Sequence, residues 1–222
     1  MLNFTTLKPR IGTSALPPVL VMLHGYGADE FDLLSIASQL DPKFLAISLQ
    51  APTKLSWGGY SWYTLTQSAE GISGDDESRI ISEKLILESL PKIITSEGGD
   101  PANIFLLGFS QGTAMCYSII GKYDLKQSGL TIRGVIALSG YIPNDVKDLI
   151  KKRDLSSIPF FQSHGVFDEL IPAFAMHEAT EILEFAGAKT FAKEYEIGHG
   201  LTEETVSDIR KWMESLAITA KD

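Results

Sequence analysis

Short runs of consecutive apolar residues alternate along this chain with longer stretches in which apolar residues recur every three or four positions. A continuous apolar run is typical of a strand buried on both faces, whereas the spaced pattern is typical of an amphipathic helix. Residues 2–8 instead alternate apolar and polar, which predicts an edge strand. The other predicted strands lie at 19–23, 44–49, 103–107, 133–138, 158–163 and 190–195, and the predicted helices at 31–40, 80–94, 113–120, 145–150, 172–185 and 206–216.

This alternation of strand and helix predicts an α/β fold with an open, mostly parallel sheet covered by helices on both faces. The chain has 222 residues, 44% of them hydrophobic, which is enough to build one core without a second domain. We therefore expect a single domain over residues 1–222 with no large cap domain. The one long interruption, residues 53–74, is rich in Gly, Ser and aromatic residues and predicts a long loop. Asp29 is placed to cap the helix that follows the strand at 19–23.

Charge and composition exclude several partners. The formal net charge of −9 argues against binding to nucleic acid and against docking on anionic membrane surfaces. The apolar runs are far shorter than the ~20 residues of a membrane span, so we expect no integral membrane segment. Residues 1–8 lack the basic and apolar blocks of a signal peptide, which favours a cytoplasmic location. The one cysteine, Cys116, excludes an intramolecular disulfide, and the sequence leaves a homodimer open.

The pentapeptide Gly108-Phe109-Ser110-Gln111-Gly112 stands between a predicted strand and a predicted helix. A Gly-x-Ser-x-Gly turn in this setting lifts the serine hydroxyl clear of the sheet, so Ser110 is the candidate nucleophile. Gln111 opens the helix, and its backbone N–H is therefore free to bind an oxyanion. The pentapeptide alone is common enough to arise by chance, and its meaning depends on partners elsewhere in the chain.

A serine nucleophile needs a general base, and the chain offers four histidines. His199 is favoured because it follows the last predicted strand, lies between two glycines and comes after every other candidate in the order Ser, acid, His. His24 and His164 precede glycines at strand ends, where a role in loop structure is the better interpretation. His177 lies within a helix at the spacing of a surface pair with Glu181.

The third catalytic member should be a carboxylate at a strand end. Asp168 is the favoured candidate, its neighbour Glu169 is a decoy, and Asp145, after the preceding strand, remains the alternative. The oxyanion requires a second N–H donor besides that of Gln111, and the amide of Tyr26, between two glycines after the first buried strand, is the candidate.

Two competing motifs fail. Gly25-x-Gly27 lacks the third glycine of a dinucleotide fingerprint, because position 30 is Glu30, and Gln50 stands where an acid should end the second strand. Residues 177–181 resemble a zinc-protease helix but end in Glu where that motif requires His. The sequence therefore implies no metal and no cofactor.

Together, in order, the motifs resemble the phospholipase/carboxylesterase family of α/β hydrolases, which includes acyl-protein thioesterases and small bacterial carboxylesterases. The resemblance spans nearly the whole chain. The motifs that carry it are Leu23-His24-Gly25-Tyr26-Gly27-Ala28-Asp29, Gln50-Ala51-Pro52, Ser61-Trp62-Tyr63, Gly108-Phe109-Ser110-Gln111-Gly112, His164-Gly165-x-x-Asp168 with Pro172, and Gly198-His199.

The resemblance implies an α/β hydrolase fold with Ser110 as nucleophile, Asp168 and His199 as its partners, and the Tyr26 and Gln111 amides as oxyanion donors. It implies a serine hydrolase that cleaves carboxylic esters or thioesters through an acyl-enzyme, with a small-molecule or lipid ester as substrate. Acyl-protein thioesterase or lysophospholipase activity, a non-catalytic binding module, and a transferase or lyase on the same scaffold are the alternatives.

The family resemblance also bears on the substrate pocket. It implies that Trp62 and Tyr63 help to wall the acyl pocket, although buried aromatic packing would explain both residues nearly as well. Thr113 stands where many members carry glycine, and Thr64 where many carry an acid. We expect Thr113 to be tolerated inside its helix, whereas Thr64 leaves the geometry of the aromatic loop, and hence the choice of substrate, open.

Overall fold

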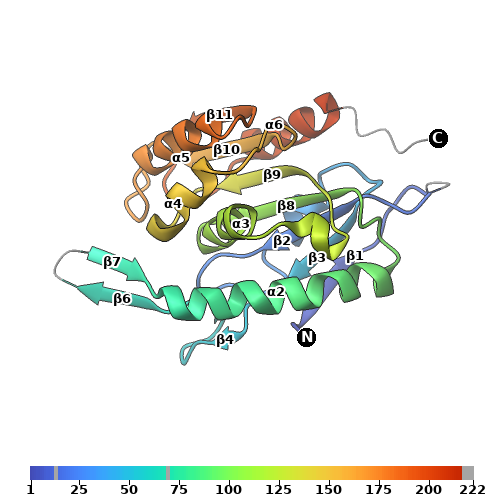
Figure 1. Cartoon of the computed structure of the whole chain (residues 1–222), viewed down its shortest axis with the longest axis horizontal. Helices are drawn as coiled ribbons and strands as arrows, with labels where there is room; N and C mark the ends of the chain where they lie inside the picture. Colours follow the sequence, from blue (N-terminus) through green and yellow to red (C-terminus); the bar gives the residue numbers. More distant parts are fainter. Residues whose placement is uncertain (13–14, 69–70, 217–222) are drawn as a thin grey trace.

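A seven-stranded sheet forms the centre of the computed structural model, which describes residues 1–12, 15–68 and 71–216 (Figure 1). The strand order is β1-β3-β2-β8-β9-β10-β11, and every neighbouring pair is parallel except β1 with β3. The sequence prediction of a mostly parallel sheet is therefore confirmed. The strands are β1 (Phe4–Leu7), β2 (Val19–Leu23), β3 (Leu45–Leu49), β8 (Ile104–Phe109), β9 (Ile132–Leu138), β10 (Phe160–Gly165) and β11 (Thr190–Tyr195).

Helices cover both faces of this sheet, as predicted. One face carries α2 (Asp76–Glu97), α3 (Gln111–Lys122), α4 (Asn144–Lys151) and α5 (Phe174–Phe185), and the other carries α1 (Leu34–Ala37) and α6 (Glu203–Ser215). Each face has its own apolar cluster. In β2, Val21 packs into one cluster while its neighbours Leu20 and Met22 pack into the other, because successive side chains of a strand point to opposite faces. This explains the continuous apolar runs.

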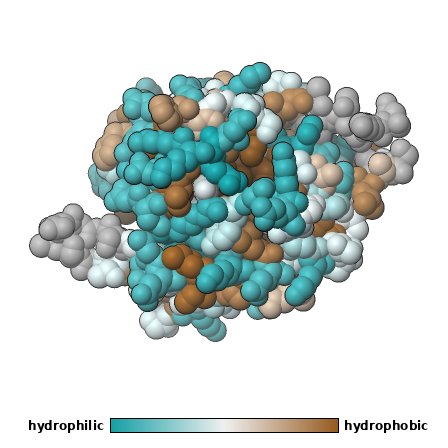
Figure 2. Space-filling model, in the orientation of Figure 1, coloured by the Kyte–Doolittle hydropathy of each residue, from teal (hydrophilic) through white to brown (hydrophobic). Residues whose placement is uncertain are grey.

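The outer surface of the α2 and α3 layer is mainly polar. Figure 2 shows this face covered largely by hydrophilic residues, with hydrophobic residues only in small separate groups. Among the described residues, no helix is long and apolar enough to cross a membrane.

The predicted helix at 31–40 is wrong in extent. Only α1 is helical there, and it begins at Leu34 without a side-chain cap. The carboxylate of Asp29 instead accepts a hydrogen bond from the amide of Phe31, at 3.0 Å. Asp29 therefore closes a local turn of its own, which is a common alternative to helix capping for this residue type.

The predicted loop at 53–74 contains two short hairpins. β4 (Thr53–Lys54) pairs with β5 (Tyr60–Ser61), and β6 (Leu65–Ser68) pairs with β7 (Gly71–Gly74). In Figure 1 the β6–β7 hairpin projects beyond the start of α2. These strands are two to four residues long and lack an alternating apolar pattern, so hydrophobic periodicity does not detect them. A short 3-10 helix, η1 (Leu125–Ser128), was likewise not predicted.

Candidate active site

Ser110 lies in the sharp turn between β8 and α3. Its backbone has φ 54° and ψ −114°, a conformation that residues other than glycine rarely adopt. The turn depends on a close approach of two backbones, because a Cβ atom on Gly112 would lie 1.9 Å from the carbonyl oxygen of Leu23. Backbone strain of this kind is typical of functional sites. The turn places Ser110 at the carboxyl edge of the sheet.

The hydroxyl group of Thr113 holds this turn in place through hydrogen bonds to the backbone of β8 and β9. Its hydroxyl lies 2.7 Å from the carbonyl oxygen of Gly108 and 2.8 Å from that of Leu138, and it accepts a hydrogen bond from the Leu138 amide at 3.0 Å. The same Leu138 carbonyl accepts the amide of Ser110, at 2.8 Å. Thr113 fits because residue 140 is glycine, whose Cβ would lie 2.3 Å from the Cβ of Thr113. The departure from the family pattern is thus accommodated, and the threonine hydroxyl ties α3 to the ends of two strands.

Asp168 and His199 are brought together from two different loops. Asp168 follows β10 and His199 follows β11, and the Nδ1 atom of His199 lies 2.7 Å from Oδ2 of Asp168. The other carboxylate oxygen of Asp168 accepts hydrogen bonds from the amides of Leu170 and Ile171, at 3.0 and 2.9 Å. The His199 ring also packs against the ring of Phe109, with centroids 5.0 Å apart.

The environment of Asp168 keeps its carboxyl group ionised. Burial alone would raise the pKa, but the hydrogen bonds from the Ile171 amide and from His199 outweigh it and hold the pKa of Asp168 below its usual value. An ionised carboxylate can only accept, so Nδ1 of His199 carries the hydrogen of their shared bond. The Nε2 atom of a neutral His199 is then unprotonated.

A second imidazole contacts Asp168, and sequence reasoning did not foresee it. The fully buried His164 has its Nε2 atom 2.7 Å from the carbonyl oxygen of Ile171 and 3.2 Å from Oδ2 of Asp168. Because a carbonyl oxygen can only accept, Nε2 of His164 is a donor and cannot serve as the base. The spacing of His164 and Asp168, four residues apart at the end of a strand, was the available signal.

The other histidines also differ from a general base. His24 is fully buried, and both of its ring nitrogens contact backbone groups. His177 is exposed, as expected, but its Nε2 atom pairs with Glu194 of β11 at 2.6 Å and not with Glu181. The sheet places Glu194 beside α5, which spacing along one helix cannot show.

The alternative acid, Asp145, lies in a cluster of ion pairs and not beside His199. The ion cluster consists of Asp76, Arg79, Glu83, Lys122 and Asp145, which join α2, α3 and α4. Asp145 lies 2.6 Å from Arg79 and 2.9 Å from Lys122, and no interaction with His199 is present among the described residues. Burial would raise the pKa of Asp145, but hydrogen bonds from these two cations outweigh it and lower the pKa. The decoy Glu169 is exposed.

The two candidate amides flank Ser110. A Cβ atom built on Gly25 would lie 3.5 Å from Cβ of Ser110, so the loop that carries Tyr26 packs directly beside the serine. Gln111 is the first residue of α3, where a helical N–H has no partner within the helix. The Gln111 side chain has a further role that the sequence did not reveal. It accepts from the Trp62 amide at 2.8 Å and donates to the Tyr63 carbonyl at 2.7 Å.

A cavity of about 920 Å³ joins these groups. Ser110, His199, Tyr26, Gln111 and Tyr63 all line it, whereas Asp168 lies behind His199 and does not. Trp62 does not line it either. That ring is completely buried, and its Nε1 atom donates to the carbonyl oxygen of His24 at 2.9 Å. Of the two aromatic residues expected at the pocket, Tyr63 therefore faces the cavity and Trp62 supports the loop behind it. The rest of the lining is mixed, with apolar residues such as Ile142, Pro143, Leu170 and Phe174, and the charged pair Lys147 and Glu178.

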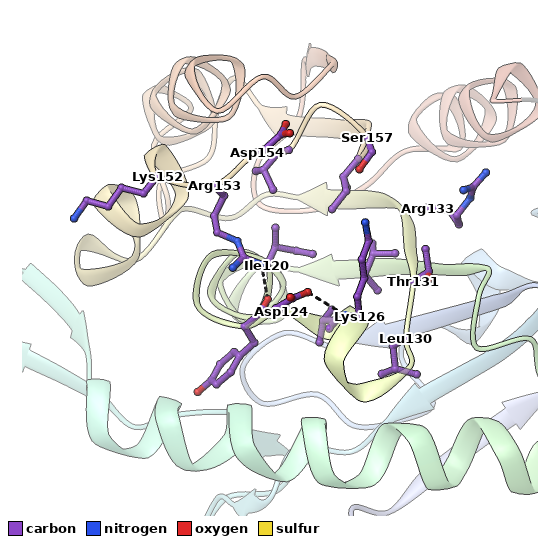
Figure 3. Close-up of a pocket in the computed structure, with 15 residues that line it drawn as sticks. Ile120, Asp124, Lys126, Leu130, Thr131, Arg133, Lys152, Arg153, Asp154 and Ser157 are labelled. Carbon is purple, nitrogen blue, oxygen red and sulfur yellow. Dashed lines mark hydrogen bonds between the residues drawn. The ribbon is translucent and has the colours of Figure 1, made fainter.

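A second cavity, of about 550 Å³, lies at the opposite edge of the sheet (Figure 3). Residues from the end of α3, from η1 and from the segments around β9 and β10 line it. Figure 3 shows Arg133 and Lys152 pointing away from it. The guanidinium of Arg153 donates to the carbonyl oxygen of Tyr123 at 2.8 Å. Neither a histidine nor a strained serine lines this cavity. The candidate nucleophile, base and oxyanion donors all line the first cavity, and Asp168 lies directly behind His199.

The mostly parallel sheet, the helices on both faces and the serine turn after β8 define an α/β hydrolase. The sequence model of the Phospholipase/Carboxylesterase family matches residues 11–217. The chain belongs to this family, whose members are hydrolases of the carboxylesterase and thioesterase type.

Individual relatives agree with this assignment. Acyl-protein thioesterase 1 of Yarrowia lipolytica is 33% identical over 175 residues, which cover 74% of this chain and 73% of the relative. Acyl-protein thioesterase 1 of Kluyveromyces lactis is 27% identical over 195 residues, covering 79% and 81%. Among solved structures, the Bacillus cereus carboxylesterase superposes with a TM-score of 0.81 at 25% identity and covers 97% of this chain and 95% of its own.

Proposed function

We propose that this enzyme hydrolyses carboxylic esters or thioesters through an acyl-enzyme on Ser110. One observation carries the proposal. Ser110 in its strained turn and His199 line the same cavity, and the Nδ1 atom of His199 is bonded to the buried carboxylate of Asp168. This is the combination of nucleophile, base and orienting acid that acyl transfer requires.

The reaction proceeds in two halves. Nε2 of His199 takes the hydroxyl proton of Ser110 as Oγ bonds to the carbonyl carbon of the substrate. The electron pair of the carbonyl bond moves to its oxygen, and the Tyr26 and Gln111 amides donate hydrogen bonds to that oxyanion. Its collapse expels the alcohol or thiol, which receives the proton from Nε2. Water then attacks the acyl-enzyme while Nε2 of His199 takes one of its protons. The bond to Oγ of Ser110 breaks, His199 returns the proton to Oγ, and the carboxylic acid is released. Acyl transfer to water needs no cofactor.

Replacement of the nucleophile tests the proposal. We expect Ser110→Ala to lower turnover of a chromogenic short-chain ester by at least roughly 10⁴-fold while leaving the circular dichroism spectrum unchanged. A fluorophosphonate should label the wild-type chain once, at Ser110. Ser128→Ala, in η1 far from the cavity, is the matched serine control and should keep full activity and labelling. Turnover retained by Ser110→Ala, or labelling at another residue, would contradict the assignment.

The choice of substrate is tested separately. The acyl-protein thioesterase relatives favour including a thioester, so a chain-length series of esters should be measured beside thioesters of the same acyl groups. A non-catalytic binding module would show no labelling of Ser110. A transferase would pass the acyl group to an added alcohol or amine in preference to water, which product analysis detects.

A further inference from the structure

His24 is a buried histidine whose two ring nitrogens both have fixed partners. Its side chain is completely shielded from solvent. The amide of Ala51 donates to Nε2 at 3.1 Å, so Nε2 must be unprotonated. The hydrogen of the neutral ring therefore lies on Nδ1, which donates to the carbonyl oxygen of Gly25 at 2.7 Å. The structure thus determines the tautomer of His24.

The hydrogen bond from Nδ1 fixes the rotation of one peptide group. The Gly25–Tyr26 bond is trans, like every peptide bond described here, so its N–H points opposite to its C=O. With the Gly25 carbonyl held toward the His24 ring, the Tyr26 amide faces the other way. The loop backbone at Gly25 packs against Ser110, and no described residue accepts a hydrogen bond from the Tyr26 amide.

Other contacts fix the path of the oxyanion loop, residues 24–28, and restrain that rotation less than the His24 bond does. The Gly27 amide donates to the Tyr60 carbonyl at 2.9 Å, and the Tyr60 amide donates to the Ala28 carbonyl at 2.8 Å. The Ala28 amide reaches the Gly25 carbonyl only at 3.3 Å. Because Gly25 has no side chain, its own ψ angle can change without a Cβ clash. A flipped peptide would aim its carbonyl oxygen, and not its N–H, at the oxyanion.

We propose that His24 is a positioning residue that sets the Gly25–Tyr26 peptide so that the Tyr26 amide faces the oxyanion. This inference rests on the proposed acyl transfer at Ser110. It explains why a polar ring is buried at the end of β2, where its Nε2 atom also accepts the Ala51 amide. The 2.7 Å hydrogen bond holds the Tyr26 amide in the orientation that the transition state needs, before the substrate binds. The loop therefore does not have to rearrange during the reaction.

The neutral ring that this role requires is consistent with its surroundings. Burial lowers the pKa of His24, and this outweighs the Gly25 hydrogen bond and the nearby carboxylates of Asp32, Asp29 and Glu30, which all act to raise it. A proton on Nε2 would also meet the Ala51 amide, which is itself a donor. The hydrogen bond from His24 to the Gly25 carbonyl is therefore made by the uncharged imidazole.

Two amide substitutions separate the two ring nitrogens. The side-chain amide of His24→Asn can occupy the position of Nδ1 and still donate to Gly25, whereas that of His24→Gln can reach the Nε2 position and loses this donor. We expect His24→Gln to lower kcat for a chromogenic ester by roughly 10²-fold, with KM changed less than about threefold, and His24→Asn to keep most of the activity. His177→Gln, at an exposed histidine, is the matched control and should behave as wild type.

A transition-state analogue distinguishes positioning from a merely structural role. A trifluoromethyl ketone forms an oxyanion on the serine, so its Ki should rise in His24→Gln by the same factor by which kcat/KM falls. Unchanged kcat and Ki in a folded His24→Gln, or a loss confined to KM, would overturn the inference. Fluorophosphonate labelling keeps the two proposals apart, because an unlabelled wild-type chain refutes the role of Ser110 before His24 is considered.

A measurement on the wild-type chain remains decisive if the variants do not fold. Nitrogen-15 NMR of the histidine rings should show His24 as the neutral tautomer with hydrogen on Nδ1 between pH 6 and pH 8. The opposite tautomer, or a charged ring in that range, would overturn the inference.

Discussion

Two regions at the carboxyl edge of the sheet each hold a carboxylate after a neighbouring strand, buried at Asp168 and partly exposed at Asp145, and the two differ in their partners. In the Asp168 loop, residues 166–173, two backbone amides donate to the carboxylate, and the imidazoles of His164 and His199 contact it from outside the loop. The ion cluster surrounds Asp145 with the cations of Arg79 and Lys122. Only the carboxylate of Asp168 contacts the histidine that would gain a proton in the proposed reaction.

The direction of the pKa shift does not distinguish the two groups. The pKa is lowered at both Asp168 and Asp145, so each is an ionised carboxylate at neutral pH. Their partners differ, because the carboxylate of Asp145 pairs with the cations of Arg79 and Lys122 while that of Asp168 is held by backbone amides and imidazole rings. The proposal of Asp168 as the acid that orients His199 therefore rests on what this carboxylate bonds, and not on how readily it ionises.

The largest expected effect comes from the Asp168 loop. Asp168→Asn keeps the size of the side chain but removes the charge that stabilises a protonated His199 and fixes its tautomer. We expect kcat for a chromogenic ester to fall by roughly 10³- to 10⁴-fold, with little change in KM. Glu169→Gln, the exposed neighbour, is the control and should retain full activity. A loss of less than tenfold in Asp168→Asn would contradict the role of this residue.

The ion cluster should respond in stability and not in activity. Glu83 is completely buried and bonds Arg79 at 2.8 Å and the Tyr123 hydroxyl at 2.9 Å. Because Glu83→Gln leaves buried cations without their full complement of charge, we expect the free energy of unfolding to fall by about 3–5 kcal/mol. Denaturant titration measures this loss, and kcat of the folded variant should stay within twofold of wild type.

A matched substitution on the same helix tests that interpretation. Glu88 is exposed on α2, and Glu88→Gln should change the free energy of unfolding by no more than about 0.5 kcal/mol. If Glu83→Gln were as mild as this control, the ion cluster would not be a stabilising feature of the fold.

Asp145→Asn decides between the two carboxylates directly. The Asp145 side chain is 34% exposed, so solvent weakens its ion pairs, and we expect a loss of only about 1–2 kcal/mol in the free energy of unfolding. Activity at 25 °C should be unchanged, in contrast to Asp168→Asn. Asp148→Asn, at an exposed position of the same helix, is the control for stability. A fall in kcat comparable to that of Asp168→Asn would restore Asp145 as the catalytic acid.

The sequence could predict the sheet because its strands are buried on both faces, and a doubly buried strand must be a continuous apolar run. Ser110 and His199 were likewise recognisable, because the glycines beside each are needed where the backbone turns sharply. The choice between Asp168 and Asp145 was beyond periodicity. It depends on Arg79 and Lys122, which lie on two other helices and meet Asp145 only after the chain has folded.

Other features were hidden for the same reason. The Gln111 side chain bonds the backbone of Trp62 and Tyr63, and the His24 ring bonds Ala51, in each case across a gap in the sequence that no local pattern records. The hairpins within 53–74 were missed because their hydrogen bonds, and not a buried apolar face, define them. Local sequence patterns thus pointed to the candidate reactive groups but not to the contacts that orient them.

Acid-induced unfolding should show the smallest difference between the two regions. A carboxyl whose pKa is lowered in the native state stabilises the fold above the unfolded value of about 3.9, and this contribution is lost as pH falls through the lower native pKa. The free energy of unfolding should therefore decline less steeply below pH 4 in both Asp168→Asn and Asp145→Asn than in wild type.

Salt distinguishes the contributions of the two carboxylates to this pH dependence, because 1 M NaCl shortens the Debye length to about 3 Å and screens the partly exposed ion pairs of Asp145. The Asp168 side chain is completely buried and bonded to two amides, so its share of the pH dependence should persist in salt. Equal salt sensitivity of the two contributions would show that both carboxylates act as simple ion-pair partners, and the contrast between the regions would fail.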